Sequence, residues 1–183
     1  MKTFFVVVVA VIGAWMIAPV SGASAQGSSC RGKDLESRME CKVIALLNSY
    51  RASSGRRKLT PARQCHQMAK SHARTMRKTK NLSHEVVRGQ DPNRRANRFG
   101  LGKARTAANK SSRLRYSGEN IARYYSTPEE VMRNWRWSLW GHNSTMLLPG
   151  HTHVGVGLSI ARDRKGVPIK GEYYWAQIFC ARK

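Results

Sequence analysis

The sequence predicts an α+β domain, with helices in its first half and a β-hairpin at its C-terminal end. Apolar residues recur every three or four positions between residues 40 and 80, the spacing of one buried helical face. The period changes to two from Val154 to Ile160, and a polar turn over 162–166 separates this run from a second apolar run around 172–180. Helices followed by paired strands are typical of the α+β class.

The first predicted helix begins at Glu40. Residues 26–39 are polar and contain few core-forming side chains, so we expect an N-terminal tail there and the folded domain over 40–183. Gly55 predicts the end of the helix. The apolar positions of its buried face are Val43, Ile44, Leu46, Leu47 and Tyr50.

A second helix is predicted to begin at Thr60-Pro61, because a hydroxyl side chain at the cap followed by a proline suits a helix N-terminus. We expect it to end near Lys80. Its apolar stripe is Cys65, Met68, Ala69, His72 and Met76.

A third helix is predicted after Thr127, which forms a capping box with Glu130. Its inward positions are Val131, Trp135 and Leu139. Residues 85–117 are basic and poor in large apolar side chains, which predicts a long loop with a short helix near 94–99.

The N-terminus has the pattern of a cleavable secretory signal. Lys2 precedes an apolar run over 4–20, and small residues follow at 23–25. The alternative is an uncleaved anchor, but the run is short for a bilayer core of about 30 Å. We therefore expect cleavage of residues 1–25 and a secreted protein, periplasmic in a Gram-negative cell.

The cysteines Cys30, Cys41, Cys65 and Cys180 all lie in the exported part, where an even number predicts two disulfides. Four cysteines allow three pairings, and the sequence does not decide among them. We favour Cys30–Cys41, a short local loop, with Cys65–Cys180 joining the second helix to the final strand. No C-x-x-C spacing indicates a metal cluster.

The chain is strongly basic, with a formal net charge of +23. Residues 51–115 hold 19 lysines and arginines against Glu85 and Asp91 alone. Such a field attracts nucleic acid, anionic lipid headgroups or acidic cell-wall polymers, although a solvated surface explains the charge equally well. The candidate anionic-partner surface comprises Arg56, Arg57, Lys58, Arg74, Arg77, Lys78, Lys80, Arg94, Arg95 and Arg98.

Several short sequence motifs occur in a characteristic order in the last third of the chain. They are Gly118-Glu119-Asn120-Ile121, Trp135, Gly141-His142-Asn143, Val154-Gly155-Val156-Gly157 and residues 174–179. Together with His84 and the helical stretch before it, they resemble the CAP superfamily of cysteine-rich secretory, antigen-five and pathogenesis-related proteins. The resemblance implies a three-layer α/β/α sandwich with a small antiparallel sheet between helices.

The resemblance also implies a cleft lined by two histidines and two glutamates. By motif these positions are His84, Glu119, Ser138 and His142, so a serine replaces the second glutamate, as in secreted bacterial members. The implied metal ligands are His84 and His142, with Glu119 as a possible third, and the implied metal is Zn²⁺ or another divalent ion. Two imidazoles and one carboxylate resemble an open zinc site whose water is activated, with Glu119 as the catalytic candidate.

Other side chains are weaker candidates. We interpret His66 and His72 as helix packing or surface residues, and His151 with His153 as a surface pair. A Ser-His hydrolase is disfavoured, because no Asp is positioned to orient the base. Among the aromatic residues, Trp135 and one of Tyr174 or Trp175 are predicted core residues, whereas Trp137 and Trp140 could contact sugar or lipid.

Three hypotheses of function follow. The first is an extracellular binding module whose cleft holds a metal and contacts an unknown small or extended ligand, without enzymatic activity. The second is a metal-dependent hydrolase that uses the same cleft. The third is a polycation that docks on anionic lipid, cell-wall polymer or nucleic acid, with affinity that falls with salt.

Overall fold

A four-stranded sheet lies between two layers of helices in the computed structural model, which describes residues 30, 34–103 and 110–183. The strand order is β1-β3-β4-β2. The strands are β1 (Thr60–Pro61), β2 (Leu114–Arg123), β3 (His153–Arg162) and β4 (Pro168–Arg182). The predicted signal peptide, residues 1–25, lies outside the described residues.

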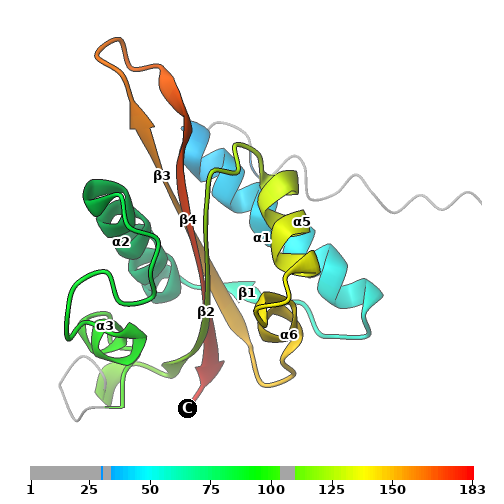
Figure 1. The fold of residues 1–183 in the computed structure, drawn as a ribbon. Helices are drawn as coiled ribbons and strands as arrows, with labels where there is room; N and C mark the ends of the chain where they lie inside the picture. The colour runs from blue at the N-terminus through cyan, green and yellow to red at the C-terminus, as the bar shows by residue number, and fades with distance from the viewer. Residues whose placement is uncertain (1–29, 31–33, 104–109) are drawn as a thin grey trace, which may run out of the picture.

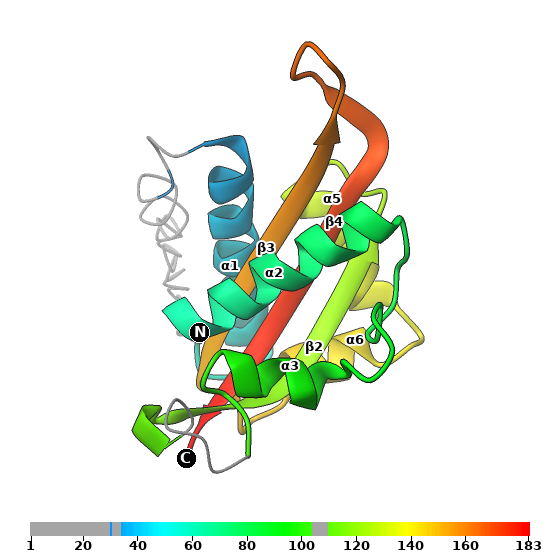
Figure 2. The same cartoon turned by 90° about the vertical axis from the view of Figure 1, so that its left-hand side faces the viewer.

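Different helices cover the two faces of the sheet (Figures 1 and 2). On one face lie α2 (Arg63–Thr79) and α3 (Pro92–Arg98). On the other lie α1 (Leu35–Ser53), α5 (Pro128–Trp137) and α6 (His142–Leu147). The predicted fold class, an α/β/α sandwich, is confirmed. Within the described part of the chain, no helix is long and apolar enough to cross a membrane.

Strand β4 supplies side chains to both apolar cores, because alternate side chains of a strand point to opposite faces, whereas the apolar side chains of β3 join only one of these cores. Val156, Leu158, Trp175 and Phe179 belong to the core on the side of α1 and α5. Their neighbours in β4 pack on α2, in a core that contains Tyr174, Ala176 and Ile178. The change of period in the sequence thus predicted the hairpin correctly.

The glycines of the V-G-V-G word allow α2 to lie directly against β3. A Cβ atom at Gly155 would come 2.0 Å from the backbone nitrogen of His66, and one at Gly157 would come 2.3 Å from the carbonyl carbon of Ala69. Any side chain at either position would push the helix off the sheet. The two glycines of this motif are therefore required for the packing of α2 on the sheet.

The first helix begins five residues earlier than predicted, at Leu35. The Asp34 carboxylate accepts a hydrogen bond of 2.9 Å from the backbone N–H of Ser37 and so caps the helix. The predicted tail over 26–39 is therefore wrong for residues 35–39. Local capping there outweighs the polar composition on which the prediction depended.

The N-terminus predicted for the second helix is also wrong. Thr60-Pro61 forms β1, which pairs in parallel with β3, and α2 begins at Arg63. A proline lacks the N–H that a central strand would need, so it fits this edge position. The predicted end is confirmed, because Lys80 adopts a left-handed conformation (φ 53°) and closes the helix.

Other local predictions agree with the structure. The capping box of Thr127 and Glu130 opens α5, and α3 is the short helix expected in the basic loop. Leu139 is the exception, since it is 99% exposed instead of facing inward. The basic loop predicted over 85–117 ends before residue 117, because β2 begins at Leu114 and pairs with β4.

The favoured disulfide pairing is confirmed. Cys30 bonds to Cys41 near the start of α1, and Cys65 of α2 bonds to Cys180 of β4. The second bridge joins positions 115 residues apart in the sequence and ties one helical layer to the sheet. No cysteine remains free among the described residues.

Candidate functional site

A buried carboxylate, Glu119 of β2, forms the centre of the candidate cleft. Its side chain is 1% exposed. The Arg95 guanidinium donates hydrogen bonds from Nη2 to both carboxylate oxygens, at 2.9 and 2.6 Å. His84 Nδ1 lies 2.7 Å from Oε1, so this nitrogen donates and the imidazole is oriented by the carboxylate. A half-exposed histidine thus meets a buried charged pair in one cluster.

Arg95 reaches this position from α3, which Asp91 caps at its N-terminus. Its Nη1 atom donates to the backbone carbonyl oxygens of His84 and Gln90, the latter at 2.9 Å. Arg95 therefore ties the segment that carries His84 to the strand that carries Glu119. Its side chain is 8% exposed, so its assignment to the anionic-partner surface is corrected.

His72 of α2 is a member of the cluster that sequence analysis did not identify. Its Nε2 atom lies 3.7 Å from Glu119 Oε1 and is buried without a hydrogen-bond partner in the described structure. Burial lowers the pKa of His72 to about 4, against the opposing influence of Glu119. The ring is therefore neutral at pH 7. Its place in the apolar stripe of α2 was the available signal, since that stripe faces the sheet.

The charge state of Glu119 follows from its partners. Burial by itself favours the neutral acid, but the hydrogen bond from His84 and the nearby Arg95 outweigh it and lower the pKa of Glu119 below its ordinary value. The carboxylate is therefore ionised at neutral pH and balanced by the guanidinium.

The second half of the cleft comes from the connection between α5 and α6. Gly141 adopts a left-handed conformation (φ 81°) that starts α6, and His142 is the first residue of that helix. The Nδ1 atom of His142 lies 2.8 Å from the hydroxyl of Ser138, at the position where the resemblance implied a glutamate. Burial and the proximity of His84 lower the pKa of His142. The two cleft histidines thus share one electrostatic environment.

Asn120 joins the two halves of the cleft. Strand alternation turns it to the face opposite Glu119, where its Nδ2 donates to the backbone oxygen of His142 and to Gln177 Oε1, both at 3.1 Å. The next residue, Ile121, accepts a hydrogen bond of 3.1 Å from Trp135 Nε1. Because β2 is an edge strand, segments on both faces of the sheet can approach one another around it.

The donor set offers two imidazoles to a metal ion. Nδ1 of each ring is already hydrogen-bonded, so Nε2 would be the coordinating nitrogen in both. The Glu119 oxygens are bonded to Arg95, and the described residues contain no group of three His, Cys, Asp or Glu side chains arranged for a metal. The described residues therefore do not fit the three-ligand set, and the donors that remain are two imidazoles, one of which is oriented by Glu119.

His151 differs from the surface residue that the sequence suggested. It is 4% exposed, its ring stacks on Phe179 at 4.5 Å, and its Nδ1 lies 2.8 Å from the Ser117 hydroxyl. Burial lowers the pKa of His151 to about 4. His151 is a core residue, and it does not form a surface pair with the half-buried His153.

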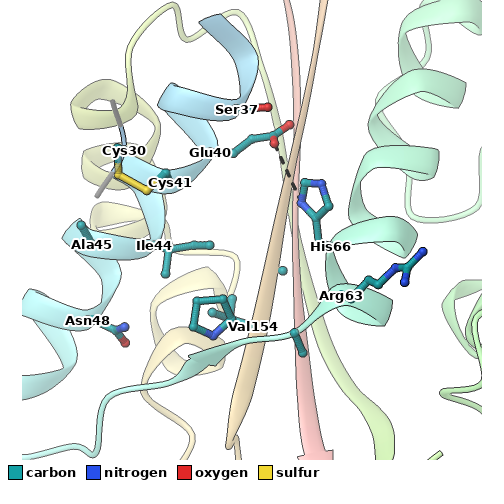
Figure 3. A pocket seen from close by; sticks show the side chains of 13 residues that line it. Cys30, Ser37, Glu40, Cys41, Ile44, Ala45, Asn48, Arg63, His66 and Val154 are labelled. Carbon is teal, nitrogen blue, oxygen red and sulfur yellow. Dashed lines mark ion pairs between the residues drawn. A yellow bond between two sulfur atoms is a disulfide. The ribbon is translucent and has the colours of Figure 1, made fainter. Parts of the chain in front are cut away.

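A separate groove of about 560 Å³ lies between α1 and α2 beside β3 (Figure 3). Glu40 and His66 point toward each other across it, with 3.9 Å between Oε2 and Nδ1. Glu40 Oε1 accepts hydrogen bonds of 2.7 Å from Lys70 and from the backbone N–H of Leu158. The groove contains none of the predicted cleft residues.

The remaining candidate surface cations are mostly exposed. Arg77 is half-buried, and its Nε donates to the Ser159 hydroxyl at 2.9 Å. Binding of anionic partners stays a prediction. The exposed members are Arg56, Arg57, Lys58, Arg74, Lys78, Lys80, Arg94 and Arg98.

Comparison with solved structures shows the same fold in extracellular and outer-surface proteins of bacteria. An extracellular Bacillus anthracis protein containing an SCP domain superposes with a TM-score of 0.61 and 23% identity, covering 81% of this chain and 41% of that one. An outer surface protein of Borrelia burgdorferi gives a TM-score of 0.56 at 14% identity, with coverage of 77% and 90%. A Staphylococcus aureus cysteine-rich secretory protein gives 0.53 at 15%, with coverage of 81% and 40%.

Sequence comparison gives the family. The uncharacterised Bacillus subtilis protein YkwD is 30% identical over 118 residues, which are 64% of this chain and 41% of that protein. This chain therefore spans less than half the length of that relative. The profile of the Cysteine-rich secretory protein (CAP) family matches residues 44–179, which include every cleft residue. The chain belongs to the CAP family.

Proposed function

We propose that this protein is an extracellular binding module whose ligand site is the cleft formed by His84, Glu119 and His142. The observation that carries the proposal is the convergence of these side chains from three separate elements, with a buried arginine that neutralises the carboxylate. Two disulfides and the extracellular or outer-surface neighbours support export.

The cleft has the chemistry to hold a divalent metal such as Zn²⁺ weakly. The carboxylate of Glu119 fixes the tautomer of His84, which leaves Nε2 as the electron-pair donor. The Nε2 atom of His142 supplies the second protein ligand. Glu119 acts as a positioning residue in this arrangement, and ligands from outside the cluster complete the coordination.

Hydrolysis is less well supported than binding. A general base must reach the proton it removes and must have a pKa near the working pH. Glu119 is buried, both its oxygens accept bonds from Arg95, and its pKa lies below the ordinary value. These features favour a positioning role over a catalytic one.

A calorimetric Zn²⁺ titration of the oxidised protein tests the proposal. We expect one ion per chain in the wild type and loss of binding in a His84→Ala/His142→Ala variant with unchanged circular dichroism. His66→Ala, in the separate groove, is the matched control and should bind as the wild type does. Undiminished binding in the double variant, or no binding by the wild type, would contradict the metal site.

Docking on anionic polymers is the second candidate function. Residues 41–84 and 131–162 contain no Asp or Glu, so long stretches of the chain carry only positively charged side chains. Such a surface should bind a polyanion with an affinity that falls steeply with salt. Binding to a sulfated polysaccharide that stays constant between low and high salt would count against it.

A further inference from the structure

The connection between α5 and α6 exposes three large apolar side chains in four residues. Trp137 is 77% exposed, Leu139 is 99% exposed and Trp140 is 89% exposed. Leu148, which ends α6, is 45% exposed. A small protein that keeps two tryptophans and a leucine in water at one site most often uses that site for binding.

An ordered turn presents these side chains. The Ser138 hydroxyl accepts a hydrogen bond of 3.1 Å from the backbone N–H of Trp140, and Ser144 Oγ donates to the Gly141 carbonyl at 2.8 Å. Trp137 is the last residue of α5, and Gly141 starts α6. The apolar side chains are thus held outward between two helix ends, which reduces the entropy lost on binding.

Positively charged side chains lie on the helix that leads into this apolar turn. Arg133 and Arg136 are exposed on the last turns of α5, and the Arg136 guanidinium lies 4.3 Å from the centre of the Tyr50 ring. The Tyr50 hydroxyl donates to Asn143 of α6 at 2.8 Å. This contact brings the C-terminal end of α1 next to α6. The exposed cations 56–58 follow that end of α1 in the chain.

We propose that Trp137, Leu139 and Trp140 insert into the surface of a bilayer that contains anionic lipids. Tryptophan favours the boundary between headgroups and acyl chains, and the aliphatic Leu139 at the apex suits the apolar side of that boundary. Arg133, Arg136 and residues 56–58 contact the anionic headgroups.

A polysaccharide could stack on the tryptophans, but it would leave the fully exposed Leu139 in water. The lipid surface accounts for the apolar and the basic side chains together, so we favour it. The inference rests on the second candidate function for its electrostatic part alone. Since Ser138 belongs both to the turn and to the cleft, insertion would bring the His142 side of the cleft to the membrane.

Vesicle binding tests the proposal. The oxidised protein is mixed with phosphatidylcholine vesicles that contain or lack phosphatidylglycerol, and bound protein is measured by sedimentation. We expect binding to the anionic vesicles and quenching of tryptophan fluorescence by brominated acyl chains. A Trp137→Ala/Leu139→Ala/Trp140→Ala variant, with all charges retained, should lose roughly tenfold or more in binding and lose the quenching.

Two control variants separate the contributions. Val167→Ala/Ile169→Ala removes exposed apolar side chains from the β3–β4 hairpin, far from α6 in Figure 1, and should bind normally. Arg56→Gln/Arg57→Gln/Lys58→Gln should bind more weakly and with less dependence on salt.

Binding by the apolar triple variant within about twofold of wild type would overturn the inference, since insertion should contribute more than that. Absence of quenching in the wild type would also overturn it. If polyanion binding persists in either case, the proposal of a basic docking surface is retained and only the proposal of membrane insertion is wrong. Concentration-dependent dimerisation that the triple variant abolishes, without quenching, would assign the turn to self-association and overturn membrane docking.

Discussion

Two buried glutamates of this protein are used in different ways. Glu40, on α1, is 4% exposed, and Glu119, on β2, is 1% exposed. Each bonds to a cation, Lys70 for the former and Arg95 for the latter. Glu40 also accepts the backbone N–H of Leu158 on β3, whereas the hydrogen bonds to the Glu119 carboxylate in the described part of the chain come from the side chains of His84 and Arg95.

The difference separates structure from candidate function. A backbone N–H holds a fixed position in the sheet, so Glu40 completes the hydrogen bonds of β3 beyond its short pairing with β1. Histidine and arginine side chains can rotate, so the contacts of Glu119 can respond to a ligand. Burial alone does not distinguish the two carboxylates, but the nature of their partners does.

Loss of the Glu119 carboxylate should have the larger effect on stability. Glu119→Ala leaves the Arg95 guanidinium, 8% exposed, without its counter-charge. We expect the free energy of unfolding in urea to fall by about 3–5 kcal/mol. A second substitution, Arg95→Met, should recover much of this loss, because no buried charge then remains. Additive losses in the double variant would show that the two side chains are not coupled.

Acid should lower the stability of the fold around Glu119 by protonating the neighbouring His72. Its folded-state pKa of about 4 lies below the ordinary 6.5, so the neutral ring contributes full stability above pH 6.5 and loses it as pH falls toward 4. The shift corresponds to roughly 3 kcal/mol. The difference between the free energies of unfolding at pH 7 and at pH 4 should be smaller in His72→Gln than in the wild type, by about that amount. Parallel profiles would contradict the neutral buried ring.

Loss of the Glu40 carboxylate should have a smaller effect. Lys70 is 20% exposed and can turn toward water. Glu40→Ala therefore leaves only the backbone N–H of Leu158 without its hydrogen-bond acceptor. We expect a decrease of about 1–3 kcal/mol in unfolding free energy. Metal binding in the cleft should be unchanged, because Glu40 lies in the separate groove. A decrease larger than that of Glu119→Ala would reverse the comparison.

Local patterns in the sequence predicted most of the architecture. Helical periodicity, the capping box at Thr127 and the alternation from Val154 to Ile160 all depend on neighbouring residues, and each is confirmed. The strands β1 and β2 were not predicted, because their pairing involves residues far away in the chain. Asp34 supplies the local capping signal for the earlier start of the first helix.

The candidate site was predicted in outline and missed in its charge balance. The resemblance identified His84 and Glu119, which the structure places 2.7 Å apart. Arg95 was counted with the surface cations, because no sequence pattern shows that α3 turns it toward a carboxylate 24 residues later. His72 was assigned to packing for a similar reason, since its distance from Glu119 depends on how α2 lies on the sheet.

An NMR titration of the histidine ring signals with Zn²⁺ tests the central claim most directly, because it locates the ligand residue by residue. The cleft predicts that the signals of His84 and His142 change together at the same zinc concentration, while His66 and His153 stay constant. Glu40→Ala should leave this pattern intact, and Glu119→Gln should weaken it by replacing the charged acceptor that orients His84 with a neutral amide. A response at His66 or His153 with His84 and His142 unchanged would contradict the assignment of the cleft as the binding site.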